Sequence, residues 1–326
     1  MDNLKNILVV IPQWRQASPA LHRAMAYAHR TGATLHLYLF DYYAPIDHSS
    51  GIFGHEVADR ARRDFLDERM RWLTQLAAGL SRQGIRVECD VIWAPEAPNS
   101  VIAKVLEVRA DLVIKDVECE RGGERRLRPE PLDWKLLRLC PAPLMLVHPE
   151  SKVMPRSVLA AVDVNVAGEA GHLNDRVMNT ARQIGSIGDC EPALLSVFSY
   201  TPIDTYASGF IADTYEIMSN AHRESLERFA DKHHVRPGLV VRLCGFDVGQ
   251  CIVDCARQRG ADLVALGSAY KGLLGRLAFG TVAESAVRKL ACDVLLVKPE
   301  HFETDLLRHL DLPVTASSEE FPAVTA

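Results

Sequence analysis

A loop with glycines at both ends holds the residues of this sequence that are best suited to bind an anion. It runs from Gly267 and Ser268 to Gly280 and Thr281, between a short apolar run and an amphipathic run that is typical of a helix. Glycine allows the backbone to approach an anion closely, and the free N–H groups at the start of a helix point toward it. The loop therefore predicts a phosphate cradle, although its glycines could equally serve only the turns between a strand and a helix.

The carboxylate of Asp163 is a second group that could contact a ligand. Asp163 ends an apolar run of the kind expected for a buried strand, and the same half of the chain has further strand ends after Val197 and at 245–247. In an open parallel sheet, ligands bind beyond the carboxyl ends of the strands, where the strand order reverses. There Asp163 could accept hydrogen bonds from a ribose or a base, or it could simply cap a turn.

Motifs that would indicate catalysis or metal binding are missing from the sequence. Neither GxSxG, HExxH, a Walker A motif nor GxGxxG occurs in a suitable context. His233 and His234 fall at the expected end of a helix, and Cys251 and Cys255 have no second ligand pair at zinc spacing. We therefore expect no enzymatic activity and no metal site, and we interpret these cysteines as small buried apolar residues.

Composition and charge limit the classes of function. The chain has 326 residues, of which 48% are apolar and 24% charged, as in an ordinary soluble protein with packed cores. The formal net charge is −5 and no basic block occurs, which argues against nucleic acid as a partner. No apolar run approaches the length of a membrane span and the eight cysteines form no regular framework, so we expect a protein of the reducing cytoplasm.

The elements that would position these groups alternate along the chain between strands and helices. Strands are expected at 6–12, 33–40, 85–93, 111–115, 144–148, 158–163, 193–198, 239–244, 262–266 and 293–298. Helices are expected at 18–29, 56–82, 97–108, 133–139, 174–184, 219–233, 249–259 and 282–290, with loop or partial helix at 201–217. This alternation predicts an α/β fold with doubly wound parallel sheets.

The second half of the chain repeats the first. Ile7–Pro12 aligns with Val158–Asp163 and Ala110–Val113 with Ala261–Val264, at one offset of 151 residues (158 minus 7 and 261 minus 110). Landmarks that stay in register over half a chain indicate a duplication. We expect two tandem domains, at 1–149 and 156–300, with a short linker between them and a disordered tail at 301–326.

These residues and their spacing resemble the universal stress protein family, and the tandem layout extends the resemblance over nearly the whole chain. Members that bind ATP carry Gly-x2-Gly-x9-Gly-Ser/Thr after the fourth strand and an aspartate at the end of the first. Gly267, Gly280, Thr281 and Asp163 stand at those places. The resemblance implies two five-stranded, Rossmann-like sheets similar to those of the adenine-nucleotide alpha-hydrolases. It also implies an ATP site in the second half, with Val197, Ser268 and Tyr270 as its remaining members.

Departures from the family pattern weaken the expected ATP site. Tyr270 takes the place of the second glycine, so ATP binding in the second half is expected to be weak or lost. In the first half, Pro12 replaces the aspartate and Asp116 takes the place of Gly267. Glu130 and Pro131 replace Gly280 and Thr281 there. Two acids and a proline without an N–H group argue against anion binding, so we predict that the first half does not bind ATP.

The leading hypothesis is a non-enzymatic cytoplasmic stress-response protein that acts through protein partners which the sequence does not name. Family domains pair through their final strands, which here lie at 144–147 and 294–297. The resemblance therefore implies that the two halves form a dimer-like pair within one chain, and it allows a homodimer of chains.

Two alternatives remain open. The second half could instead be a binding module for an apolar or lipid-like ligand, without ATP. An enzyme of the related nucleotide-hydrolysing type would carry Ser-Gly-Gly-x-Asp-Ser where this sequence reads Asp163-Val-Asn-Val-Ala-Gly, so this reading is less favoured. The apolar module rests on residues in and beside the loop: Tyr200, Tyr206, Phe210, Ile211, Tyr215, Ile217, Met218, Tyr270, Leu273, Leu274, Leu277 and Phe279.

Overall fold

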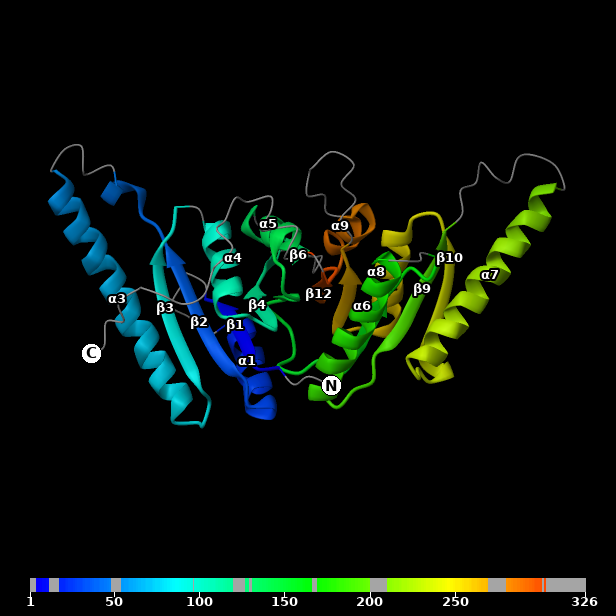
Figure 1. Cartoon of the computed structure of the whole chain (residues 1–326), viewed down its shortest axis with the longest axis horizontal. Coiled ribbons are helices and arrows are strands. Elements are labelled where there is room, and N and C mark those ends of the chain that lie inside the picture. The colour runs from blue at the N-terminus through cyan, green and yellow to red at the C-terminus, as the bar shows by residue number, and fades with distance from the viewer. Residues whose placement is uncertain are drawn as a thin grey trace.

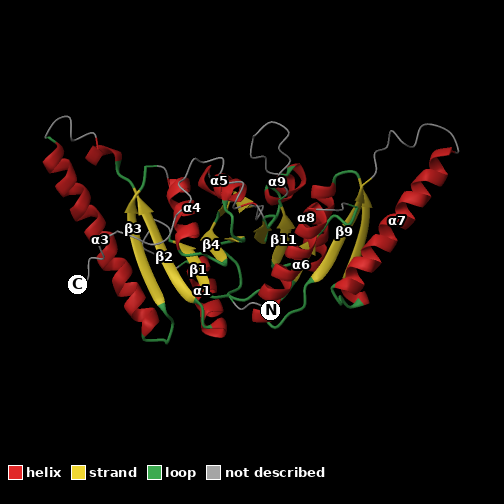
Figure 2. Cartoon of the chain, in the orientation of Figure 1, coloured by secondary structure: helices red, strands yellow, loops and turns green. Residues whose placement is uncertain are grey.

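One ten-stranded sheet runs through the whole molecule (Figures 1 and 2). The structure, a computed structural model, describes residues 4–11, 18–47, 54–95, 97–119, 127–128, 131–165, 169–199, 210–268, 280–300 and 302. The strand order is β10-β9-β8-β11-β12-β7-β4-β1-β2-β3. All neighbouring strands are parallel except β12 and β7, which are antiparallel. Each half thus forms the predicted five-stranded parallel sheet.

The strands of the first half are β1 (Asn6–Val10), β2 (Thr34–Asp41), β3 (Val87–Trp93), β4 (Leu112–Asp116) and β7 (Leu144–Val147). Those of the second half are β8 (Val158–Ala161), β9 (Ala193–Ser199), β10 (Val240–Gly245), β11 (Leu263–Gly267) and β12 (Asp293–Val297). The helices are α1 (Pro19–Thr31), α3 (His55–Ser81), α4 (Ala97–Glu107), α5 (Pro131–Leu139), α6 (Glu169–Ile187), α7 (Phe210–Lys232), α8 (Val248–Arg259) and α9 (Thr281–Val287), with a short 3-10 helix at Pro237–Leu239.

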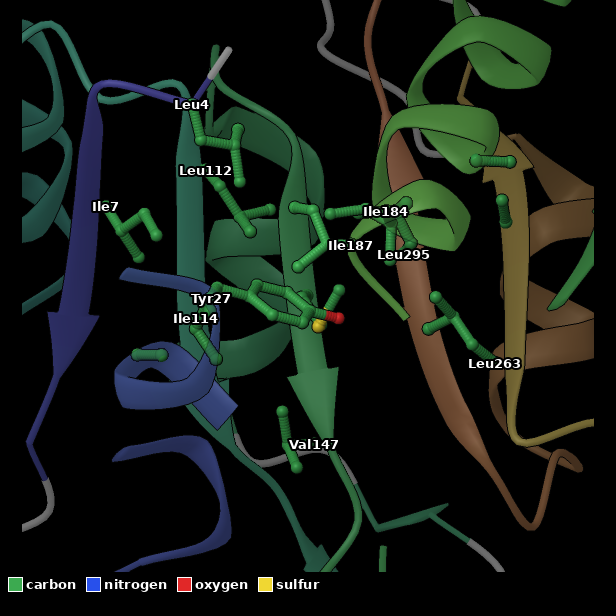
Figure 3. Close-up of a cluster of buried hydrophobic side chains, with 14 of the residues drawn as sticks. Leu4, Ile7, Tyr27, Leu112, Ile114, Val147, Ile184, Ile187, Leu263 and Leu295 are labelled. Atoms are coloured by element: carbon green, nitrogen blue, oxygen red, sulfur yellow. The ribbon is translucent and has the colours of Figure 1, made fainter. Parts of the chain in front are cut away.

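The antiparallel pair β7–β12 joins the two halves, as the resemblance to the family implies. Leu144 lies opposite Leu296 and Leu146 opposite Val294, and all four side chains are buried. The same core continues across this junction: Figure 3 shows Ile114 and Val147 of the first half in one buried cluster with residues of the second. The halves therefore share their core, and burial of each such aliphatic side chain contributes about 1.5–3 kcal/mol.

Two helical layers cover the two faces of the sheet. Helices α1, α3, α6 and α7 bury residues in one core cluster, and α4, α5, α8 and α9 bury residues in the other. The central strands, such as β1 and β7, are buried on both faces, which explains their continuous apolar sequences, whereas the edge strands β3 and β10 are partly exposed and carry charged residues. Local signals set the helix ends: the hydroxyl of Ser18 accepts from the N–H of Leu21 before α1, and Gly32 ends that helix in the left-handed conformation (φ 74°).

Two local predictions differ from the structure. The helix expected at 219–233 begins earlier, at Phe210, so the partial helix allowed for within 201–217 forms the first turns of α7. Ile217 and Met218 are 68% and 54% exposed, so these turns lack the amphipathic pattern that reveals a helix packed on a sheet. No strand was expected between 115 and 144, whereas β5 (Glu118–Cys119) and β6 (Leu127–Arg128) pair antiparallel there, and α5 begins at Pro131 instead of 133. Two-residue strands are too short to show a period in the sequence.

Candidate functional site

The strand order of the second half reverses between β8 and β11. From β8 the chain moves to β9 on one side, and after β10 it crosses to β11 on the other side. Ala161 lies opposite both Leu195 and Leu266 in the parallel ladders. Asp163, Val197 and Ser268 each follow two residues later, so they lie at the same edge of three adjacent strands. This reversal of strand order is where open α/β sheets bind ligands.

Asp163 is exposed at this edge, and its backbone is held firmly. The side-chain oxygen of Asn174 accepts from the N–H of Asp163 (3.2 Å), and its nitrogen donates to the Asp163 carbonyl (2.6 Å). The Asp163 carboxylate accepts from the N–H of Asn165 (3.0 Å), which is the turn contact considered for it above. A carboxylate has further acceptor capacity, so this contact leaves room for a ligand donor. Sequence reasoning missed Asn174, whose only signal is an amide on the apolar side of α6.

Of the loop's glycines that the structure describes, packing requires one, Gly267, and does not require the other, Gly280. A side chain at Gly267 would lie 3.0 Å from the side chain of Leu173, so this glycine allows α6 to approach the end of β11. Gly280 has φ −60° and nothing within 4 Å of its missing side chain, and it precedes Thr281, the exposed first residue of α9. Packing thus accounts for Gly267 and does not account for Gly280. Val197 is buried on the face covered by α8, and Tyr270 lies outside the described residues.

Ser268 and Lys298 form a buried pair at the ends of β11 and β12. The two residues are 1% and 3% exposed, and Nζ of Lys298 donates to Oγ of Ser268 (3.0 Å). The N–H of Ser268 donates to the carbonyl of Val297 (3.0 Å). Burial lowers the pKa of the Lys298 ammonium to about 7. Sequence reasoning treated Lys298 as a strand end, but the period of two places it on the buried face with Val294 and Leu296.

A second buried polar cluster lies between α7 and the strands β9 and β10. Nε of Arg242 donates to Nδ1 of His222 (3.2 Å), and Nε2 of His222 is 3.2 Å from Oγ of Ser196. Because arginine can only donate, Nδ1 is the acceptor, and Nε2 carries the proton and donates to the serine. Burial and the nearby Arg242 lower the pKa of His222, while the carboxylate of Asp163 opposes this shift. A histidine in this state cannot take a proton from Ser196.

The corresponding edge of the first half is filled by the protein's own charges. The Asp116 carboxylate, at the place of Gly267, accepts from the N–H of Ala20 (2.8 Å) at the start of α1. Nζ of Lys115 lies 2.8 Å from Oδ1 of Asp133, which is fully buried on α5. Burial raises the pKa of Asp116 above its usual value. Glu130 and Pro12 lie outside the described residues.

The remaining candidate groups have structural partners. Nε2 of His233 lies 2.7 Å from the carboxylate of Asp175 at the end of α7. Cys255 is buried and Cys251 half-buried, and both are free thiols. Within the ranges that the structure describes, no three histidine, cysteine or acidic side chains gather as a metal site would require. No helix in those ranges is long and apolar enough to cross a membrane.

Of the residues proposed to line an apolar site, Tyr215, Ile217 and Met218 are exposed on α7. The Tyr215 ring also contacts that of Phe198, with centroids 5.6 Å apart. The side chains of the other residues proposed for that site lie outside the described part of the chain: Tyr200, Tyr206, Phe210, Ile211, Tyr270, Leu273, Leu274, Leu277 and Phe279.

The sequence of this chain is similar to those of universal stress proteins. Residues 176–298 match the model of the universal stress protein family, a range that includes Val197, Gly267 and Gly280. Universal stress protein E of Salmonella typhi is 26% identical over 322 residues, which cover 93% of this chain and 97% of that protein. The resemblance to the universal stress protein family is thereby confirmed. The homolog of universal stress protein E in Haemophilus influenzae is 24% identical over 90% of this chain and 97% of its own length.

Solved structures show the same fold over nearly the whole chain. A candidate universal stress protein from Pseudomonas aeruginosa UCBPP-PA14 superposes with a TM-score of 0.74 at 24% identity, covering 95% of this chain and 98% of that one. A universal stress protein from Archaeoglobus fulgidus DSM 4304 gives a TM-score of 0.55 at 14% identity, covering 90% and 98%. The α/β fold of this chain is therefore shared with universal stress proteins over nearly its whole length.

Proposed function

We propose that this chain is a non-enzymatic, cytoplasmic stress-response protein whose second half binds a nucleotide such as ATP. One observation carries the proposal: Asp163, Val197 and Ser268 lie at the same level of three adjacent strands, near their carboxyl ends, where the strand order reverses. An adenosine would lie against Asp163 and Val197, and its phosphates would lie toward Gly280 and Thr281. The resemblance to ATP-binding family members supports the same assignment.

The first half would serve as a scaffold without a ligand. Asp116 stands where a phosphate would need a glycine, and its oxygen already accepts the N–H of Ala20. Lys115 is engaged by Asp133 at 2.8 Å. A phosphate placed among these groups would meet two carboxylates at the cost of several kcal/mol of repulsion and desolvation. The pseudo-dimer would then carry one site per chain, and pairing of two chains would give two.

The absence of a catalytic role is supported by the state of His222, whose pKa is influenced by the Asp163 carboxylate. His222 donates to Ser196 through Nε2 and is held in that tautomer by Arg242. A general base for hydrolysis would need an unprotonated nitrogen directed at the nucleophile. The proposed protein would therefore hold its nucleotide and signal through protein partners, as a binding module does.

Calorimetric titration of the full-length protein with ATP tests this function, with native mass spectrometry of the purified protein beside it. Gly280→Glu should abolish ATP binding, because it adds a carboxylate at a position where no other atom lies within 4 Å. Gly79→Glu on α3 adds the same charge at an equally open position far from the site and should leave binding unchanged. If wild-type protein binds no ATP at millimolar concentration, the proposal fails. A co-purifying lipid-sized mass would instead favour the apolar module.

A further inference from the structure

The buried lysine beside Ser268 is the feature that the family pattern does not explain. Lys298 follows β12 directly, and its Nζ donates to the hydroxyl of Ser268, the residue that follows Gly267. A hydroxyl that accepts one hydrogen bond keeps its own proton for a further acceptor. Among the described residues no acceptor of that proton is recorded. Lysine and serine thus offer a donor pair at the edge where the proposed site lies.

We propose that Lys298 sets the charge of this site: its ammonium form stabilises a phosphate group bound beside Ser268, so that binding is accompanied by proton uptake at Nζ. This inference rests on the proposed function and adds a residue and a regulation to it. The buffer supplies this proton: the neutral amine of Lys298 takes it up and becomes the ammonium ion.

The surroundings of Nζ support a lysine that titrates near neutrality. Burial lowers its pKa to about 7, and the Cys140 thiol is a titratable group that opposes this shift. That thiol comes from the segment between α5 and β7, and burial raises its own pKa to about 12, so it is neutral at pH 7. The Phe302 ring faces Nζ with its centroid 4.9 Å away, and β11 contributes the Ser268 hydroxyl. A phosphate anion nearby would favour the ammonium form and raise the pKa.

The first half lacks this arrangement. Its edge holds the pair of Lys115 with Asp133, and Val117 and His148 stand at the places of Ser268 and Lys298. The Asp133 carboxylate, 2.8 Å from Nζ of Lys115, occupies the place where an anion would have to bind this lysine. A pH-dependent anion site is thus expected in the second half alone.

Calorimetric titration with ATP at pH 6, 7 and 8 tests the inference, with each pH run in two buffers of different protonation heat. A group of apo pKa about 7 whose pKa rises by one to two units on binding weakens affinity about five- to tenfold between pH 6 and pH 8. Lys298→Met keeps the length of the side chain without its charge and should remove the part of this pH dependence that comes from Lys298. The slope that remains in Lys298→Met measures the titration of ATP itself. Lys232→Met, on a surface lysine paired with Asp175, should behave as wild type.

The outcomes separate the inference from the function. Proton uptake near pH 7 in the wild type and in Lys232→Met, absent from a folded Lys298→Met, establishes the role of Lys298. ATP binding with the same pH slope in wild type and Lys298→Met refutes it while the proposed function stands. If wild-type protein binds no ATP at any of the three pH values, both are wrong. Thermal unfolding of each variant at pH 8 verifies that the fold is intact.

Discussion

The ion pair between Arg23 and Asp293 should be the most sensitive contact between the two halves. Nη2 of Arg23 on α1 lies 2.7 Å from Oδ2 of Asp293 on β12, and the two side chains are 1% and 0% exposed. Oδ1 of Asp293 also accepts from the N–H of His148 (2.8 Å) and from the hydroxyl of Ser151. One carboxylate thus binds α1, the end of β7 and the linker between the halves.

Asp293→Asn preserves the size of the side chain and removes only its charge. The guanidinium of Arg23 would then be buried against an amide, with the carbonyl of Lys152 as its remaining strong acceptor. Breaking one member of a buried ion pair costs about 3–5 kcal/mol, because a charge is left without compensation away from water. A domain pair of this size has about 5–15 kcal/mol in total, so the variant should lose a large part of its stability.

Urea unfolding followed by circular dichroism measures this loss. Asp189→Asn is the matched control, because Asp189 pairs with Arg30 at 2.6 Å but the two side chains are 79% and 47% exposed. An exposed pair contributes at most about 1 kcal/mol. Combining Arg23→Met with Asp293→Asn should recover about 2 kcal/mol or more relative to Asp293→Asn alone. A loss below about 1 kcal/mol for Asp293→Asn, equal to that of the control, would show that the buried pair does not hold the halves together.

The loop carries two further predictions. Gly267→Ala should destabilise the fold by about 1–3 kcal/mol, because its new carbon would lie 3.0 Å from the Leu173 side chain, whereas Gly280→Ala should leave stability unchanged or raise it by up to about 1 kcal/mol. Urea unfolding compares the two, and equal effects would rule out the packing role of Gly267. Tyr270→Gly should raise the affinity for ATP about fivefold or more in calorimetric titration, because a side chain in place of the family's second glycine costs about 1 kcal/mol or more if ATP binding requires a left-handed backbone there. An unchanged affinity would show that Tyr270 does not obstruct the site.

The fold could be predicted almost entirely from the sequence, because its signals are local. Strands such as 144–147 are continuous apolar runs, and Ser18, Pro19 and Gly32 mark the ends of α1 within their own turns. The junction of the halves was implied by the resemblance to the universal stress protein family, whose domains pair through their final strands. The start of α7 could not be found in this way, because Ile217 is exposed and contributes no packing signal.

The sequence predicted which strand ends meet at the candidate site, but it did not predict the side chains that contact them. Asp163 and Ser268 end neighbouring strands, and the order of elements alone places such ends together. The partners that give these residues their chemistry come from elsewhere in the chain. Asn174 holds Asp163 from α6, and Lys298 reaches Ser268 from β12. Pairings of this kind depend on which side chains meet across a packed core, and neither composition nor periodicity records that.

The residues of the candidate site differ in whether the packed core requires them. Those that it does not require indicate where a ligand would bind. Gly267 is explained by the approach of α6, so its presence is no evidence of a ligand. Asp163 and Thr281 are exposed, and no atom of the described residues lies within 4 Å of the position that a side chain at Gly280 would take, so the packed core does not determine their types. Lys298 is buried at a cost that an apolar residue would avoid. One edge of the sheet thus holds two kinds of group. Some are exposed groups that the fold does not need, and one is a buried charge without which the fold would be more stable. That combination is expected where a site serves a ligand at the expense of stability.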